Sequence, residues 1–356
     1  MIVNSLDILN KVQNLLKEDH LPQIKKSITK ISESVQIHPA TSIGQIHIRI
    51  NGSATQLNKE VLLKDLNQIL ETQTLERIKY YIKRLVKNIS EEKTGKINDL
   101  NLNRWKEYGD ILTDSLWYLD KRDSSGAHSA GYWGNFIPQI PHQLLQRYTK
   151  RGEWVLDAFL GSGTTLIECK RLGRNGIGVE LQKRVAQSAV KAIEQEEDLF
   201  STKSEIMVAD SSTFDFKAEL KKRDIKSVQF LIMHPPYWDI IMFIEDKRDL
   251  SNASSIDDFL QMFGKVVDAT YPVLDKGRYF AVVIGDKYSA GNWIPLGFYT
   301  MQEVLKRKFS LKSIIVKNFD ETKGKRNQKE LWRYRALVGG FYIFKHEYIF
   351  LFRKNK

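Results

Sequence analysis

Residues 153–173 read EWVLDAFLGSGTTLIECKRLG, and they give the strongest indication of the fold class. An apolar run ends at Asp157, Gly161 and Gly163 mark a turn, and residues with helical spacing follow. Glycine allows a tight turn whose backbone stays open to a ligand. The order of strand, glycine turn and helix is typical of the first unit of a parallel α/β sheet.

Short apolar runs continue this alternation along the rest of the chain. They predict further strands over residues 175–181, 205–210, 228–234, 279–286 and 348–354. We therefore expect an α/β protein with a doubly wound sheet from about residue 150. Ligands of such sheets bind at the carboxyl ends of the strands, near the topological switch point. That edge would collect Asp157, Glu180, Asp210 and His234.

Residues 1–110 predict a mostly helical appendage. Helical spacing follows Ser5, a candidate cap, and recurs over residues 58–70 and 75–89, whereas residues 43–52 alternate as a strand does. The polar stretch 88–101 is typical of a linker. We expect two domains, 1–110 and 111–356. The first shows no catalytic set of side chains, and packing, oligomerisation and DNA contact stay open as its role.

The composition indicates a soluble globular protein. With 356 residues, of which 42% are apolar, the chain can bury a sizeable core. No apolar run approaches the roughly 18 residues that cross a bilayer, and the N-terminal residues lack a basic segment leading into an apolar one. We expect a cytoplasmic protein without a membrane partner. The single cysteine, Cys169, excludes an intrachain disulfide and disfavours a cysteine-rich zinc site.

The net charge of +12 predicts an anionic partner, and its excess lies near the C-terminal end. Residues 303–356 carry 15 Lys and Arg against 5 Asp and Glu, whereas residues 1–110 carry 17 against 13. In residues 323–336, KGKRNQKELWRYRA, basic side chains are interleaved with aromatic ones, which suits a phosphate backbone and exposed bases. A solvated charged loop is the alternative. The residues predicted to contact DNA are Lys325, Arg326, Arg333 and Arg335.

The glycine turn and the next strand have the spacing of a nucleoside-cofactor site. Glu180 follows Gly161 by 19 residues, where an acid holds ribose hydroxyls in such folds. Leu166 stands where the dinucleotide fingerprint requires glycine, and the Gly-Lys-Ser/Thr of a phosphate-binding loop is absent. The glycine pair alone is compatible with a structural turn. Acids at the ends of three successive strands favour a cofactor.

Three motifs resemble those of the S-adenosylmethionine-dependent DNA amino-methyltransferases, which methylate adenine N6 or cytosine N4. They are VLDAFLGSGTT at 155–165, GVEL at 178–181 and MHPPYW at 233–238. The resemblance covers about residues 115–352, and the motif order is like the family's gamma arrangement. It implies a Rossmann-like methyltransferase sheet with S-adenosyl-L-methionine as cofactor. Residues 134–154, GNFIPQIPHQLLQRYTKRGEW, look like the family's segment that closes over the methionine part.

The resemblance also implies roles for single residues at the cofactor. Asp157 and the glycine turn would line the methionine and sulfonium side. Glu180 would hold the ribose hydroxyls, and Asp210 would bind the adenine amino group. The turn residues concerned are Phe159, Gly161, Ser162, Gly163 and Thr164.

The proline pair of MHPPYW implies the acceptor site. A base inside a duplex must be flipped out before its amino group can react. Tyr237 would stack on that base, while His234 and the Pro235 carbonyl accept hydrogen bonds from the amino group. Pro235 and Pro236 would stiffen the turn. The family usually has Asp, Asn or Ser at position 234, and a neutral imidazole can also accept. A structural histidine at a strand end is the alternative.

The resemblance predicts site-specific methylation of double-stranded DNA at cytosine N4 or adenine N6. The alternatives are an RNA or protein methyltransferase with the same cofactor site, and a DNA-binding protein with a degenerate methyltransferase fold. Methylation at cytosine C5 is disfavoured, because it needs a cysteine nucleophile and Cys169 fits ordinary packing. The seven histidines show no metal-ligand spacing. A restriction nuclease partner and the oligomeric state stay open, and residues 1–110, 239–270 and 286–335 are candidates for reading the DNA sequence.

Overall fold

The computed structural model describes residues 7–50, 53–119, 121–128, 134–289, 291–319 and 329–355. The chain divides into two compact units. The first comprises Met1–Lys96 and Leu100–Ile111, and the second comprises Ile97–Asp99 and Leu112–Lys356. Within the described ranges, no helix combines the length and the apolar character that a bilayer crossing requires.

The first unit packs helices around a single apolar core, as the helical spacing predicted. Its core-facing residues recur every three or four positions, for example Ile24, Ile28 and Ile31 in one helix and Ile78 and Ile82 in another. The predicted strand at 43–52 is confirmed as β1, which pairs antiparallel with β2. Ser5 lies outside the described residues. The elements are α1 (Leu9–Asn14), η1 (Leu15–Lys17), α2 (Leu21–Ile37), β1 (Gln45–Ile50), β2 (Ser53–Asn58), α3 (Lys59–Leu70), α4 (Leu75–Ser90) and η2 (Leu102–Glu107).

The stretch 88–101, predicted as a linker, is more structured than its polarity indicates. Its first residues belong to α4, which runs to Ser90. Asp99 belongs to the second unit, where its carboxylate accepts hydrogen bonds from the Arg151 backbone N–H at 2.7 Å and from Arg174 at 3.0 Å. Polar residues that find partners in a neighbouring element are ordered, and composition alone does not reveal those partners.

The second unit is built on an eight-stranded sheet in the order β3-β11-β12-β8-β7-β4-β5-β6. Strands β4 to β8 run parallel, and β12 is antiparallel to both of its neighbours. The chain leaves β4 towards β5 and β6, then crosses back to β7 and β8, so the switch point lies between β4 and β7. The strands are β3 (Leu116–Trp117), β4 (Trp154–Asp157), β5 (Asn175–Glu180), β6 (Ser204–Val208), β7 (Val228–Met233), β8 (Leu274–Ile284), β11 (Phe309–Asn318) and β12 (His346–Lys354).

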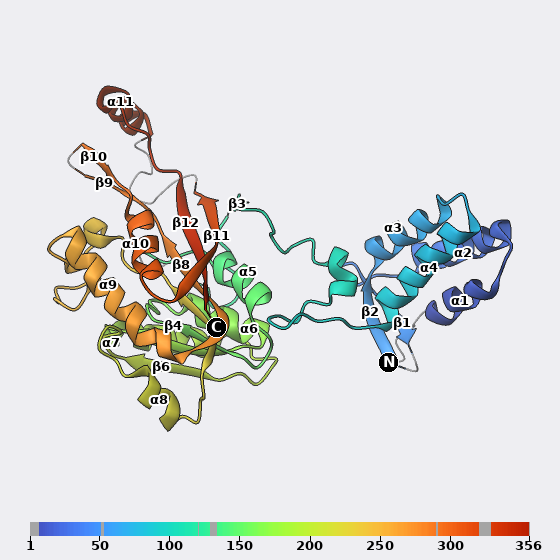
Figure 1. Ribbon diagram of the computed structural model, residues 1–356, viewed down its shortest axis with the longest axis horizontal. Helices are drawn as coiled ribbons and strands as arrows, with labels where there is room; N and C mark the ends of the chain where they lie inside the picture. Colours follow the sequence, from blue (N-terminus) through green and yellow to red (C-terminus); the bar gives the residue numbers. More distant parts are fainter. Residues whose placement is uncertain are drawn as a thin grey trace. The chain divides into compact units, whose positions relative to one another are not determined.

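Helices cover both faces of this sheet, which explains why its central strands are continuous apolar runs. Alternate residues of β7 enter different cores: Phe230 and Ile232 pack with α5, whereas Leu231 and Met233 pack with α9. Figure 1 shows α5 and α6 on one side of the sheet and α9 and α10 on the other. The doubly wound α/β prediction is confirmed. The helices are α5 (Gln139–Tyr148), α6 (Thr164–Leu172), α7 (Lys183–Gln195), α8 (Phe216–Lys222), α9 (Ile256–Thr270), α10 (Leu296–Leu305) and α11 (Lys329–Gly339).

Parts of the two stretches predicted to read the DNA sequence belong to this scaffold. In the stretch 239–270, α9 buries Phe259, Phe263 and Val267 in the core. In the stretch 286–335, β11 forms a full strand beside β12. The short elements η3 (Trp238–Ile240), η4 (Leu250–Asn252), η5 (Tyr271–Val273), β9 (Lys287–Ser289) and β10 (Asn292–Ile294) connect these parts.

Candidate active site

The glycine turn after β4 is held by the carboxylate of Asp157. Its oxygens accept hydrogen bonds from the Phe159 backbone N–H at 3.0 Å and from the Thr165 hydroxyl at 2.5 Å. Burial raises the pKa of Asp157 to about 6, although the two hydrogen bonds act in the opposite direction. Gly163 has a φ of +85°, and a Cβ there would lie 3.1 Å from Ile193 of α7. The left-handed backbone and the close approach of Ile193 therefore favour glycine immediately before α6.

Glu180, the last residue of β5, closes this turn from the neighbouring strand. One carboxylate oxygen accepts from the Gly161 backbone N–H at 3.0 Å, and the other accepts from that of Gln182 at 2.9 Å. Burial raises the pKa of Glu180, against the effect of these hydrogen bonds. Each oxygen keeps a second lone pair for a ligand.

A cavity of about 720 Å³ lies at the carboxyl ends of the strands, and both predicted sites contribute to its lining. Its volume is in the usual range for small-molecule sites. The predicted residues that line it are Phe159, Gly161, Thr164, Glu180, Asp210, His234, Pro235, Pro236 and Tyr237. The remaining three, Asp157, Ser162 and Gly163, do not line it and instead build the turn. One cavity therefore joins the glycine turn to the proline turn.

His234 belongs to a polar chain that enters from two other strands. Its Nε2 lies 3.2 Å from the Tyr237 hydroxyl, which donates to Glu347 Oε2 at 2.8 Å. Glu347 Oε1 accepts from Lys317 Nζ at 3.0 Å. Burial lowers the pKa of His234 to about 4, with Glu347 acting to raise it and Lys317 to lower it. The imidazole is therefore neutral near pH 7.

The Tyr237 ring is fitted closely to the end of β8. A Cβ on Gly285 would lie 2.8 Å from Tyr237 Cε2, so only glycine leaves room for the ring. Burial, followed by the nearby Glu347 carboxylate, raises the pKa of Tyr237 well above its ordinary value. The phenol therefore keeps its proton and remains a hydrogen-bond donor.

Several cavity residues escaped the motif analysis, because they lie outside the motifs or far along the chain. Asn135 accepts from the Ser162 hydroxyl at 2.6 Å, and its buried Nδ2 has no partner among the described residues. Arg122 donates to the Phe136 carbonyl at 2.8 Å. They also include Asp249, Lys317, His346 and Glu347. Asn135 belongs to the segment 134–154, and the resemblance of this segment to the family's cofactor-closing segment is the feature of the sequence that pointed towards it.

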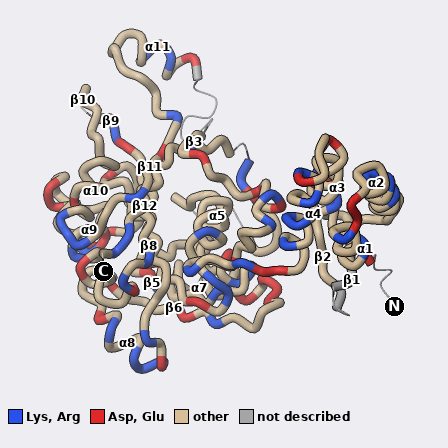
Figure 2. Tube along the Cα trace, turned by 45° about the vertical axis from the view of Figure 1, so that its right-hand side comes forward, with Lys and Arg blue, Asp and Glu red and all other residues tan. Residues whose placement is uncertain are grey.

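The predicted DNA-binding residues fall in two groups. Lys325 and Arg326 lie outside the described residues. Arg333 and Arg335 are exposed on α11, and Arg335 lies over the Trp332 ring at 5.1 Å from its centre. Trp332 lines the cavity, so α11 brings its basic residues to the cavity's border. Basic residues also occur along α4 and α8 (Figure 2), so positive charge is not confined to the C-terminal segment.

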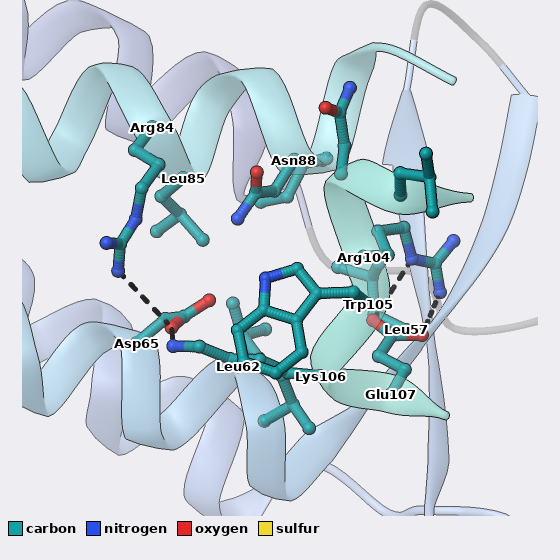
Figure 3. A pocket seen from close by; sticks show the side chains of 14 residues that line it. Leu57, Leu62, Asp65, Arg84, Leu85, Asn88, Arg104, Trp105, Lys106 and Glu107 are labelled. Carbon is teal, nitrogen blue, oxygen red and sulfur yellow. Dashed lines mark hydrogen bonds and ion pairs between the residues drawn. The ribbon is translucent and has the colours of Figure 1, made fainter. Parts of the chain in front are cut away.

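A second, smaller cavity of about 180 Å³ lies within the first unit. Figure 3 shows the indole of Trp105 beside it, with Arg84 and Lys106 both directed at Asp65. Lys106 Nζ lies 2.6 Å from the Asp65 carboxylate, and Arg104 pairs with Glu107. All three basic side chains are thus paired with a carboxylate, and the group keeps one net positive charge. We interpret this cavity as a packing gap where η2 lies against the helices α3 and α4.

A cluster centred on the buried Glu168 lies outside both cavities. His128 Nε2 and His142 Nδ1 lie 2.6 and 2.7 Å from its two oxygens. The sequence spacing missed this meeting of histidines and carboxylate, because three separate segments bring them together. Arg171 donates to both Glu168 and Asp123, so its guanidinium supplies positive charge beside these two carboxylates. The neighbouring Cys169 is fully buried, and burial raises its pKa, as expected for packing.

The strand order and the position of the large cavity define a doubly wound α/β protein whose large cavity lies at the topological switch point. The chain belongs to the DNA methylase family of the N6 and N4 type, whose match extends over residues 9–191 and 228–356. The resemblance stated from the three motifs is confirmed.

Curated relatives match shorter stretches. The chain is 38% identical over 101 residues to the type II methyltransferase M2.DpnII of Streptococcus pneumoniae, covering 27% of this chain and 34% of that protein. It is 30% identical over 97 residues to the type II methyltransferase M.BglI of Bacillus subtilis, covering 27% of this chain and 26% of that protein. The matched stretches thus span about a third of these relatives or less.

Solved structures show more distant likenesses. TrmN from Thermus thermophilus matches at a TM-score of 0.40 and 16% identity, over 62% of this chain and 49% of that one. A methyltransferase from Methanosarcina mazei matches at a TM-score of 0.40 and 13% identity, over 60% of this chain and 97% of that one. Neither likeness supports a statement about function.

Proposed function

We propose that this protein transfers a methyl group from S-adenosyl-L-methionine to the exocyclic amino group of a base flipped out of double-stranded DNA. The acceptor is cytosine N4 or adenine N6. A single observation carries the proposal: Glu180 and Asp210 line the same cavity as His234, Pro235, Pro236 and Tyr237. Family membership and the type II names of the relatives support DNA as substrate and a restriction-modification context.

The residues at the glycine turn suit the cofactor. Both Glu180 oxygens have a lone pair left for ribose hydroxyls, and Asp210 offers a carboxylate to the adenine amino group. Asn135 Nδ2, which has no partner among the described residues, is a donor for the carboxylate of the methionine part. When bound, S-adenosylmethionine supplies a methyl group activated by the positive sulfonium.

The proline turn suits an amino group as acceptor. His234 is neutral and can accept a hydrogen bond, as can the Pro235 carbonyl. Two acceptors fix the orientation of the amino nitrogen and direct its lone pair away from themselves. Tyr237 offers an aromatic ring for stacking in the cavity lining.

DNA is the favoured substrate because α11 stands at the cavity border. Trp332 reaches the cavity while Arg333 and Arg335 on the same helix are exposed. Flipping exposes a base to aromatic side chains while basic residues hold the phosphates. Lys325 and Arg326 extend the same basic segment in the sequence. A restriction nuclease partner stays a prediction from the sequence.

Labelled S-adenosylmethionine tests the proposal against its alternatives. We expect unmethylated duplex DNA to take up the label, whereas RNA and protein do not. Glu180→Ala should weaken cofactor binding by about 1–3 kcal/mol in calorimetry, since a charged hydrogen-bonding partner is lost. Label in RNA or protein alone would establish the second function, and cofactor binding without any transfer would establish a degenerate fold.

A further inference from the structure

A continuous polar chain links the proline turn to two strands far along the sequence. It runs from His234 through Tyr237 and Glu347 to Lys317, with heavy-atom distances of 3.2, 2.8 and 3.0 Å. Glu347 on β12 and Lys317 on β11 are paired in the sheet register, and both are buried. All four side chains line the large cavity.

The direction of each hydrogen bond along this row of polar side chains follows from the groups at its Lys317 end. Lys317 is a donor only, and an ionised Glu347 is an acceptor only. Burial raises the pKa of Glu347, but the positive charge of Lys317 and the hydrogen bonds that Glu347 accepts from Lys317 and Tyr237 outweigh it, so the pKa lies below its usual range. Tyr237 must therefore direct its O–H at Glu347. Its oxygen can then only accept from His234.

We propose that Glu347, held by Lys317, acts through Tyr237 to fix His234 as the tautomer with its proton on Nε2. Nδ1 then carries the free lone pair. Nδ1 makes no hydrogen bond within the described part of the chain, so it is available to the amino group of a base. Glu347 and Lys317 are thus positioning residues for the proposed methyl transfer, on which this inference rests.

The tautomer decides whether the site can hold its substrate. An amino group donates hydrogen bonds, so it needs Nδ1 as an acceptor. The opposite tautomer would place an N–H against another N–H. The Phe136 ring, whose centre lies 4.9 Å from that of the imidazole, packs against His234 and limits its movement.

Glu347→Gln should reverse the donor and acceptor directions of the hydrogen bonds from residue 347 to His234 while keeping nearly the same side-chain shape. Lys317 still requires an acceptor, so the amide oxygen should face Lys317 and the amide NH₂ should face Tyr237. Tyr237 would then accept from Gln and donate to His234 Nε2, leaving the proton on Nδ1. A wrong histidine tautomer costs about 10²- to 10⁴-fold in rate where the histidine acts directly. We expect methyl transfer to fall by about 100-fold.

Nitrogen NMR of the 356-residue chain, labelled at histidine, tests the inference. His234 is assigned by its absence from the spectrum of His234→Asn. In the wild type at neutral pH, Nε2 should show a pyrrole-like shift and Nδ1 a pyridine-like shift. In Glu347→Gln the two shifts should exchange, with cofactor affinity unchanged. Glu303→Gln is the matched control, since Glu303 is a buried, ion-paired glutamate that does not line the cavity.

The outcomes separate this inference from the proposed function. A wild-type Nδ1 that carries the proton overturns the inference, even if Glu347→Gln fails to fold. So does a folded Glu347→Gln that keeps both the wild-type shifts and the wild-type rate. Correct shifts in a wild-type protein that methylates no DNA would leave the tautomer established and overturn the function instead.

Discussion

At the scale of single residues, His234 determines how the site should respond to pH. An imidazole ordinarily has a pKa of about 6.5, but burial lowers that of His234 to about 4. Below its pKa the ring gains a proton on Nδ1 and becomes a donor that faces a donating amino group. Above its pKa the ring is an acceptor. Acceptor function is therefore present at neutral pH and lost only well below it.

Single-turnover rates should reflect this shift. We expect the wild-type rate of methyl transfer to be flat from about pH 6 to 8, and to fall only towards the lowered pKa. Nearby DNA phosphates raise the pKa and would move the fall towards pH 6. His234→Asn keeps an acceptor that does not titrate, so it should retain part of the activity without the acid fall.

DNA binding and folding are measured across the same range as controls. An acid fall that persists unchanged in His234→Asn, while both controls stay constant, would show that another group titrates and that His234 is structural.

The residues of this site differ in how far the sequence could reveal them. Glu180 and the proline turn could be predicted because each lies within a short motif. Glu347 could not, since it stands 110 residues beyond Tyr237 and reaches it only because β12 lies next to β8. Asp157 was found by its motif, but its contacts place it under the turn and not in the cavity lining.

At the scale of elements, α11 is the least packed helix of the second unit. Most of its side chains are exposed, including the apolar Leu337 and Val338 at 71% and 70%. An apolar and basic helix beside a cavity fits contact with a large polyanion that has exposed bases. The interleaved basic and aromatic residues of this segment were visible in the sequence, but their place beside the cavity was not.

The salt dependence of DNA affinity tests this role. Neutralising Arg333 and Arg335 should reduce the slope of log affinity against log salt by about one for each lost phosphate contact. Cofactor affinity should stay the same. Lys221 and Lys222 on α8 form a matched control pair, because neither lines the cavity. An equal slope in the α11 variant and the wild type would identify α11 as a solvated charged helix.

Elements differ in predictability for a physical reason. The buried parallel strands are apolar on both faces, so β4, β5, β7 and β8 stand out from their surroundings. Strand β11 lies near the sheet's edge and carries Lys312 and Lys317 among its apolar residues, which hides it within a basic stretch. Its lysine at 317 is buried against Glu347, a partner that no local pattern shows.

At the scale of the whole molecule, the chain combines a helical unit with its own core and a sheet unit that holds the large cavity. The DNA methylase match begins at residue 9 and includes most of the helical unit. Among its described residues, the helical unit contributes no side chain to the large cavity. The proposed chemistry therefore belongs to the second unit.

The identity of the methylated nucleoside formed from duplex DNA tests the proposed methyl transfer to an exocyclic amino group. The 356-residue chain is incubated with S-adenosylmethionine and unmethylated genomic DNA. The DNA is then digested to nucleosides and analysed by mass spectrometry. We predict N4-methylcytosine or N6-methyladenine with the wild type, and neither with His234→Ala, which should still bind the cofactor. Formation of 5-methylcytosine, or unmodified DNA beside methylated RNA, would contradict amino-methylation of DNA by this protein.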